Sequence, residues 1–231
     1  MSALALCVMS LEKELFPEVT EDYFYKKASF LARLGSGSAC RSVKGDLVVW
    51  GAHKEIPFSS DEYGIEYPFK IADVFKDFQD TILLVDKGKK KVSSTVGHNL
   101  MHGHPFAEAR FKQAHDHLNA LIPVFEQGDL EQFIKIVERE ALTLHGMMMS
   151  SDPYFLLMKP NTLAIINKIW EKREESKVPV CFTLDAGANV HMLYPSKNKE
   201  EILEFVKNEL VVYCENGHYI CDEIGQGSKK L

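Results

Sequence analysis

Three consecutive segments between residues 105 and 169 have apolar residues at helical spacing, and they constrain the fold more than any other feature of the sequence. The first covers residues 105–126, and the second follows a break at Gly128. Asp129 and Asn161 stand before the second and third segments, where their side chains can cap the first helical turn. The apolar positions are Phe106, Phe111, Ala114, Leu118, Leu121, Ile122, Phe125, Leu130, Phe133, Ile134, Val137, Leu142, Leu163, Ile165, Ile166 and Ile169. We therefore predict three successive helices.

Strand-like runs flank these helices. "DTILLVD" (80–86) precedes them, and "VPVCFTLD" (178–185) and "NVHMLYP" (189–195) follow them. A helix over 198–210 and a strand pair over 211–224 complete the pattern. This order predicts an α+β fold in which helices pack on one face of an antiparallel sheet.

The first 75 residues have a different pattern. Apolar residues from Ala3 to Leu15 predict a helix, and a second helix is expected over 21–33. A buried strand over 46–51 and a short strand over 67–74 follow. Because so apolar a first helix needs something to pack against, we expect the chain to begin inside a domain. We predict a partial N-terminal α/β domain over 1–75 and an α+β domain over 76–231.

The composition excludes some classes of protein. The net charge of −6 at pH 7 argues against non-specific nucleic-acid binding, although a local basic pocket remains compatible with it. No apolar run is long enough to span a bilayer, and the first residues lack the features of a signal peptide. The five cysteines form no CxxC pair, which favours reduced thiols in a cytoplasmic protein, used as small core residues.

The stretch "ARLGSGSACRS" (32–42) is the first candidate for binding chemistry. Gly37 allows a close backbone approach, Ser36 and Ser38 can donate hydrogen bonds, and Arg41 can hold a carboxylate or phosphate with two parallel bonds. The alternative is a flexible connector, since the P-loop pattern is absent. The apolar flanks and the embedded arginine favour a ligand site.

Two further motifs are weaker when taken alone. In "FTLDAGANVHMLY", Asp185 stands at a strand end before a tight turn, where an aspartate is most often a cap or turn residue. In "KVSSTVGH" (91–98), Ser94 could contact a phosphate or belong to an edge strand, and local pattern favours the strand. Histidines at 98, 102, 104, 115 and 117 have no zinc-like spacing, so we predict exposed positions and no metal site.

Taken together, "GSGSACRS" with the following V-x-W strand, "KVSSTVG" and "FTLDAGAN" occur in the order found in a known family. The chain resembles the diphosphomevalonate decarboxylases of the GHMP kinase superfamily over essentially its whole length. The resemblance implies a GHMP-kinase-like fold and the ATP-dependent, Mg²⁺-assisted decarboxylation of mevalonate 5-diphosphate to isopentenyl diphosphate, a step of isoprenoid biosynthesis. It also implies a small-molecule substrate, no nucleic acid or membrane, and a homodimer.

The resemblance assigns a role to each motif. Ser36, Gly37 and Ser38 would bind the substrate, and Arg41 would hold the carboxylate that is later lost. Ser94 would lie near the diphosphate. Asp185 would orient or deprotonate the C3 hydroxyl for attack on the γ-phosphate of ATP.

Three alternatives remain open. Family members have a serine-rich ATP loop before the helix that resembles residues 1–15, so we expect this chain to lack ATP-binding residues and to be inactive and prone to self-association when expressed alone. A phosphomevalonate decarboxylase or a mevalonate-type kinase is the alternative within enzymes. A non-catalytic C-terminal remnant is the alternative outside them.

Overall fold

The computed structural model describes residues 1–88, 100–225, 227 and 228. They form two compact units, one comprising Met1–Lys70 with the described residues from Gly225 onward, and the other Ile71–Ile224. The domain assignment of 1–75 and 76–231 stays a prediction.

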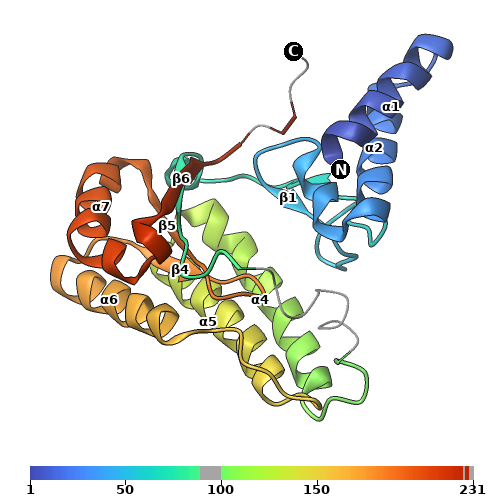
Figure 1. Cartoon of the computed structure of the whole chain (residues 1–231). Coiled ribbons are helices and arrows are strands. Elements are labelled where there is room, and N and C mark those ends of the chain that lie inside the picture. Colours follow the sequence, from blue (N-terminus) through green and yellow to red (C-terminus); the bar gives the residue numbers. More distant parts are fainter. Residues whose placement is uncertain (89–99, 226, 229–231) are drawn as a thin grey trace. The chain divides into compact units, whose positions relative to one another are not determined.

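The first unit is built on two helices, α1 (Ser2–Leu15) and α2 (Glu21–Gly35), which lie side by side (Figure 1). Thr20 caps α2 by accepting a hydrogen bond from the amide of Tyr23 at 3.2 Å. Small side chains allow the two helices to approach closely. Their buried cluster consists of Ala5, Met9, Ala28, Ala32 and Val43. Both helices predicted for this part of the sequence are confirmed.

The strands of the first unit are shorter than predicted. After a 3₁₀ helix, η1 (Gly37–Ser42), two short strands, β1 (Val48–Val49) and β2 (Ile65–Glu66), pair in antiparallel orientation, and Lys44 forms an isolated bridge with Gly227. The short strand predicted over 67–74 is wrong, since β2 ends before it. Pro68 has no amide hydrogen to donate to a neighbouring strand, which disfavours continuing the ladder there.

The second unit contains an antiparallel sheet with strand order β4-β5-β3-β6. Its strands are β3 (Phe78–Leu83), β4 (Cys181–Thr183), β5 (Val190–Pro195) and β6 (Tyr219–Glu223). In this register Thr81 of β3 pairs with Met192 of β5 and with Cys221 of β6. The three internal strand predictions and the antiparallel sheet are confirmed.

Four α-helices accompany the sheet in the described part of this unit: α4 (Ala107–Gln127), α5 (Leu130–Met149), α6 (Pro160–Ser176) and α7 (Lys199–Phe205). The last is continued by a π-helical turn over Val206–Leu210. Asp129 caps α5 as predicted, by accepting from the Gln132 amide at 3.0 Å. The cap predicted at Asn161 is wrong. Pro160 occupies the first position of α6, where its fixed φ suits a helix start. The side-chain amide of Asn161 donates instead to the Tyr213 carbonyl at 3.0 Å.

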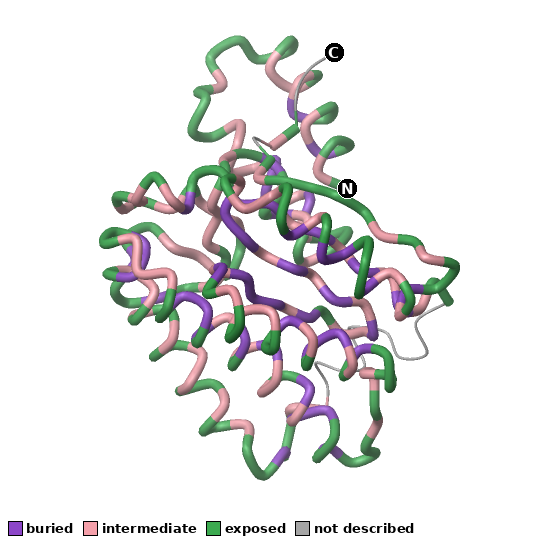
Figure 2. Tube along the Cα trace, turned by 90° about the vertical axis from the view of Figure 1, so that its left-hand side faces the viewer, coloured by how far each residue is buried: buried purple, intermediate pink, exposed green. Residues whose placement is uncertain are grey.

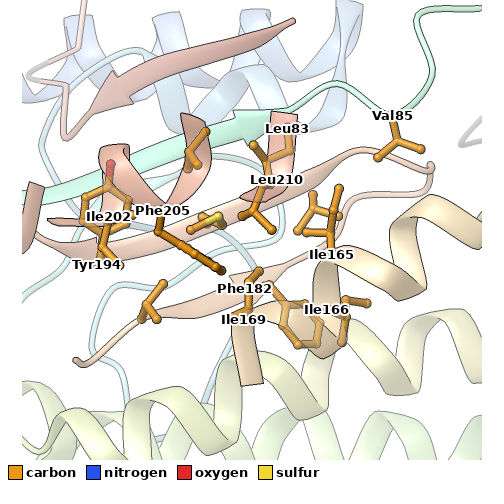
Figure 3. Close-up of a cluster of buried hydrophobic side chains, with 14 of the residues drawn as sticks. Leu83, Val85, Ile165, Ile166, Ile169, Phe182, Tyr194, Ile202, Phe205 and Leu210 are labelled. Carbon is orange, nitrogen blue, oxygen red and sulfur yellow. The ribbon is translucent and has the colours of Figure 1, made fainter. Parts of the chain in front are cut away.

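One face of the sheet carries the main core (Figure 3). Alternate strand residues project to this face, where they meet side chains of α6 and α7. The cluster includes Leu83, Phe182, Val190, Met192, Tyr194, Ile165, Ile166, Ile169, Ile202 and Phe205. Buried residues follow these strands and the inner sides of the helices (Figure 2). This arrangement confirms the α+β class with helices on one face of an antiparallel sheet.

The C-terminal strand pair predicted over 211–224 is wrong, because only β6 forms there. Residues Val211–Tyr213 and Glu215–Gly217 are 3₁₀ turns. Asn216 and Gly217 both have positive φ, 54° and 68°, as in a tight hairpin turn, but the helical turn at Val211–Tyr213 replaces the first strand of the predicted pair.

The core positions predicted for the cysteines are confirmed for three of the five. Cys40, Cys181 and Cys214 are buried as expected, whereas Cys7 and Cys221 are exposed, and all five are free.

Within the described ranges, none of the helices has the length and apolarity needed to cross a bilayer.

Candidate active site

The segment 36–42, called the Gly/Ser loop below, is held against α2 by buried contacts. The Ser29 hydroxyl of α2 donates to the Cys40 carbonyl at 2.9 Å and accepts from the Gly64 amide at 2.9 Å. Cys40 is buried, and burial raises the pKa of its thiol. These contacts fix the buried side of the loop, while Ser36, Ser38 and Arg41 remain exposed.

Gly37 is required by a close contact with an aromatic ring. A Cβ at this position would lie 2.9 Å from Cη2 of Trp50. The Trp50 indole is itself held, because its Nε1 donates to the Asp61 carbonyl at 2.9 Å. The loop backbone therefore approaches Trp50 as closely as a glycine allows.

Arg41 differs from the neighbouring cations in the same unit. Lys44 pairs with Glu66 at 2.9 Å and Lys26 with Asp22 at 3.0 Å around a cavity of about 250 Å³. By contrast, none of the described residues forms an ion pair or side-chain hydrogen bond with Arg41. An exposed guanidinium without an internal partner is suited to binding an anionic ligand with two parallel hydrogen bonds.

Asp185 lies on the turn between β4 and β5, in the second unit. Its side chain is exposed, and its carbonyl accepts from the Gly187 amide at 2.7 Å. No described residue offers the Asp185 carboxylate a hydrogen bond or an ion pair. The carboxylate is thus available to a ligand.

The Asp185 turn is anchored at three points by neighbouring elements. Nε2 of His145 on α5 lies 3.1 Å from the Asp185 carbonyl oxygen. The Thr162 hydroxyl of α6 donates to the Ala188 carbonyl at 2.7 Å. The Asn189 side-chain oxygen accepts from the Asp86 amide at 2.9 Å. The first two bonds make the position of the turn depend on α5 and α6, and the third ties it to the segment that follows β3.

His145 is the residue of this site that sequence reasoning missed. It is 1% exposed and lies on a stripe of α5 whose other members are mostly apolar. A polar residue on an apolar helical stripe is a signal that could have indicated a buried hydrogen-bonding role. Its partner, 40 positions away in the chain, could not have been found from the helix pattern.

A histidine lies on the strand that follows the turn. Nδ1 of His191 is 2.8 Å from Oδ2 of Asp80. This hydrogen bond raises the His191 pKa above its ordinary value; burial opposes the rise, and the charges of Asp80, Asp185 and Asp222 add to it. This side of the sheet therefore has acidic character near Asp185.

The structure brings some predicted site residues together. Ser36, Gly37, Ser38 and Arg41 share one loop of the first unit, and Asp185 belongs to the second. Ser94 lies outside the described residues, as does His98. Within the ranges that are described, no cluster of His, Cys, Asp and Glu could hold a metal ion.

The exposure predicted for the histidines is wrong at two positions. His104 is buried, with Nε2 3.1 Å from the Met147 carbonyl oxygen. His117 is largely buried beside Glu140, which also pairs with Arg110. Both histidines stabilise the α4–α5 region.

The antiparallel sheet and its helices define an α+β protein with a GHMP-kinase-like fold, and two family models identify it further. Residues 81–227 match the Mevalonate 5-diphosphate decarboxylase C-terminal domain, and residues 1–63 match the Diphosphomevalonate decarboxylase-like N-terminal domain. The chain belongs to the mevalonate 5-diphosphate decarboxylase family.

Curated relatives and solved structures agree with this assignment. A diphosphomevalonate decarboxylase of Ganoderma lucidum is 29% identical over 185 residues, covering 77% of this chain and 46% of its own length. The mevalonate diphosphate decarboxylase of Legionella pneumophila superposes with a TM-score of 0.74 at 26% identity, over 95% of this chain and 64% of that one. The Staphylococcus aureus enzyme gives 0.79 at 25% identity, over 98% and 65%. The chain spans about half the length of the curated relatives it matches.

Proposed function

We propose that this chain functions in the ATP-dependent decarboxylation of mevalonate 5-diphosphate to isopentenyl diphosphate. The observation that carries the proposal is the Asp185 turn. Its exposed carboxylate has no ion-pair or hydrogen-bond partner among the described residues, and its backbone is anchored through His145, Thr162 and Asn189. The names of the relatives support it. One solved relative, 25% identical, is described in complex with MVAPP, AMPPCP and magnesium.

The proposed roles follow from the chemistry of each side chain. Arg41 would hold the substrate carboxylate, and Ser36, Gly37 and Ser38 would contact the substrate through hydroxyl and amide groups. Ser94, outside the described residues, would contact the diphosphate. Asp185 would accept the proton of the C3 hydroxyl, whose oxygen attacks the γ-phosphate of ATP and releases ADP.

Phosphorylation makes the C3 oxygen a good leaving group. When it departs as inorganic phosphate, the carboxylate carbon–carbon bond breaks, CO₂ leaves, and its electron pair forms the new double bond. The exposed Arg41 guanidinium can stabilise the carboxylate until that bond breaks. The protein's contribution is therefore positioning and electrostatics rather than a covalent intermediate.

Magnesium would enter this reaction with ATP. Mg²⁺ is usually held by nucleotide phosphates, waters and one or two carboxylates, so the lack of a metal cluster among the described residues fits a nucleotide-carried ion. When bound, it neutralises charge on the transferred phosphoryl group. Of the described carboxylates that the resemblance places at the site, Asp185 is the one that could contribute a ligand oxygen.

A second candidate substrate is mevalonate 5-phosphate. The phosphomevalonate decarboxylase of Haloferax volcanii is 24% identical and aligns with 89% of this chain, a larger share than the Ganoderma lucidum relative does. A homodimer and a cytoplasmic location are further parts of the proposal.

Calorimetric titration separates these candidates. The chain is titrated with mevalonate 5-diphosphate, with mevalonate 5-phosphate and with inorganic diphosphate. We expect saturable binding that is tightest for mevalonate 5-diphosphate. Tighter binding of the monophosphate would favour the second candidate, and no preference over inorganic diphosphate would contradict both. Steady release of CO₂ and ADP in the presence of Mg-ATP would exclude a non-catalytic module and would contradict the expected inactivity of the chain expressed alone.

A further inference from the structure

One stripe of α5 faces the interior with two polar residues on it. Its members are Ile134, Glu138, Ala141, His145 and Met148, all buried. Glu138 has its charge partner, since it pairs with Arg173 at 2.6 Å and accepts from the Trp170 indole at 3.0 Å. No carboxylate of the described residues is bonded to His145. Its ring forms a hydrogen bond with the backbone carbonyl of Asp185 instead.

The bond made by His145 defines the state of its ring. A carbonyl oxygen can only accept, so Nε2, 3.1 Å from the Asp185 oxygen, must carry the hydrogen and donate it. Burial lowers the His145 pKa below its ordinary value, which favours the neutral ring. The neutral tautomer compatible with this contact has Nδ1 unprotonated.

We propose that His145 is a positioning residue for Asp185, whose Nε2–H bond to the Asp185 carbonyl sets the direction in which the carboxylate is presented. This inference rests on the proposed role of Asp185 as proton acceptor. None of the described side chains orients the Asp185 carboxylate directly, so its direction depends on the backbone that His145 holds.

His104 provides a matched control for this proposal. It is also buried, and its Nε2 also lies 3.1 Å from a backbone carbonyl, that of Met147 at the end of α5. Its acceptor is not part of the Asp185 turn. His104 also accepts from the Phe106 amide at 3.1 Å, and its Nε2 lies 3.3 Å from the Ser150 hydroxyl. His104→Leu therefore removes at least as many hydrogen bonds as His145→Leu, but only His145→Leu removes an anchor of Asp185.

The first test is nuclear magnetic resonance of the chain. In the unaltered protein, ring ¹⁵N shifts of His145 should show the Nε2–H tautomer, and the Nδ1–H tautomer would overturn the proposal. His145→Leu should speed hydrogen exchange of the Gly187 amide about tenfold, as expected for loss of roughly one hydrogen bond. His145→Gln keeps a donor and should stay close to the unaltered rate, and His104→Leu should leave Gly187 unchanged. Equal effects of His145→Leu and His104→Leu would also overturn the proposal.

The second test is kinetic. In a preparation in which the unaltered sequence turns over, His145→Leu should lower kcat and leave KM for the mevalonate substrate nearly unchanged, and His145→Gln should restore most of kcat. A merely structural role predicts equal losses in both variants. If the unaltered protein binds no mevalonate substrate, the proposed function fails. The tautomer and exchange measurements still decide whether His145 positions Asp185.

Discussion

Asp80 of β3 and His191 of β5 form a hydrogen-bonded pair across the central strands of the sheet, with Oδ2 and Nδ1 2.8 Å apart. Both side chains are about one quarter exposed, 28% for Asp80 and 26% for His191. The pair lies on the sheet face opposite the main core, because both residues alternate with core positions along their strands.

This pair should make stability depend on pH. The His191 pKa is raised in the folded protein, first by the hydrogen bond to Asp80. The stabilisation is therefore complete below the unfolded pKa of about 6.5 and is lost as the pH rises through the folded pKa. Asp80→Asn should lower the free energy of unfolding by about 1 kcal/mol at pH 6 and by less at pH 9. Urea titrations at both values measure this, with Asp116→Asn as an exposed control. An equal loss at pH 6 and pH 9 would argue against a charged pair.

Gly37→Ala should displace Trp50. The added Cβ would come within 2.9 Å of the indole, a rigid group that cannot move away cheaply. We expect a loss of about 1–3 kcal/mol, typical of overpacking, and a shifted indole N–H resonance for Trp50. Gly146→Ala is the control, since nothing lies within 4 Å of its Cβ position. In the interior of α5 it should stabilise by about 0.5–1 kcal/mol. Unchanged stability and an unmoved Trp50 resonance in Gly37→Ala would show that the contact imposes no constraint.

Thr162→Val tests the second anchor of the Asp185 turn. It keeps the side-chain shape but removes the buried hydroxyl that donates to the Ala188 carbonyl at 2.7 Å and accepts from the Lys159 amide at 3.1 Å. Leaving that carbonyl without a partner should cost about 1–3 kcal/mol in thermal or urea unfolding. Thr143→Val removes a hydroxyl that bonds within α5 and is exposed, so it should change stability by less than about 0.5 kcal/mol. Similar losses in the two variants would argue that Thr162 does not anchor the turn.

Local patterns predicted the elements whose signals are contained within a few turns of chain. The apolar spacing found α1, α2, α4 and α5, and the Asp129 cap followed from one side chain and one amide. The predicted Asn161 cap was wrong because α6 begins at Pro160, which places Asn161 inside the helix. The Asn161 side-chain amide donates instead to the Tyr213 carbonyl, a partner that the helix pattern does not indicate. The last strand pair was wrong because Val211–Tyr213 continue the preceding helix as a 3₁₀ turn, so that only β6 is extended there.

The motifs of the candidate site could be found in the sequence, but the contacts that hold those motifs in place could not. Gly37 and Asp185 stood in recognisable stretches, although a lone aspartate on a turn was more simply explained as a cap. The contacts that distinguish them come from distant residues: Trp50 against Gly37, and His145 and Thr162 around the Asp185 turn. Such contacts arise from packing of helices on the sheet, which neither periodicity nor motif spacing encodes.

Arg41→Lys separates substrate binding from ATP binding. Lysine keeps the charge but loses the fixed fork that holds a carboxylate with two parallel bonds. In a preparation in which the unaltered sequence turns over, KM for mevalonate 5-diphosphate should rise about tenfold or more while KM for ATP changes little. Steady-state kinetics with each substrate varied in turn gives both values. An equal rise for both substrates would show that the assigned role of Arg41 is wrong.

We propose that the Asp185 carboxylate accepts the proton of the C3 hydroxyl, and turnover of Asp185→Asn measures how far the reaction depends on it. Asparagine keeps the shape of the side chain and leaves the carbonyl bonds to His145 and Gly187 in place. In a preparation in which the unaltered sequence turns over, release of CO₂ and ADP from mevalonate 5-diphosphate and Mg-ATP is compared between the unaltered sequence, Asp185→Asn and Asp116→Asn. We predict that Asp185→Asn binds the substrate normally while kcat falls by about 10²–10⁴, as expected for loss of a general base. Asp116→Asn should retain full turnover, because that exposed carboxylate pairs with Lys112 on α4. An unchanged kcat in Asp185→Asn would contradict the account.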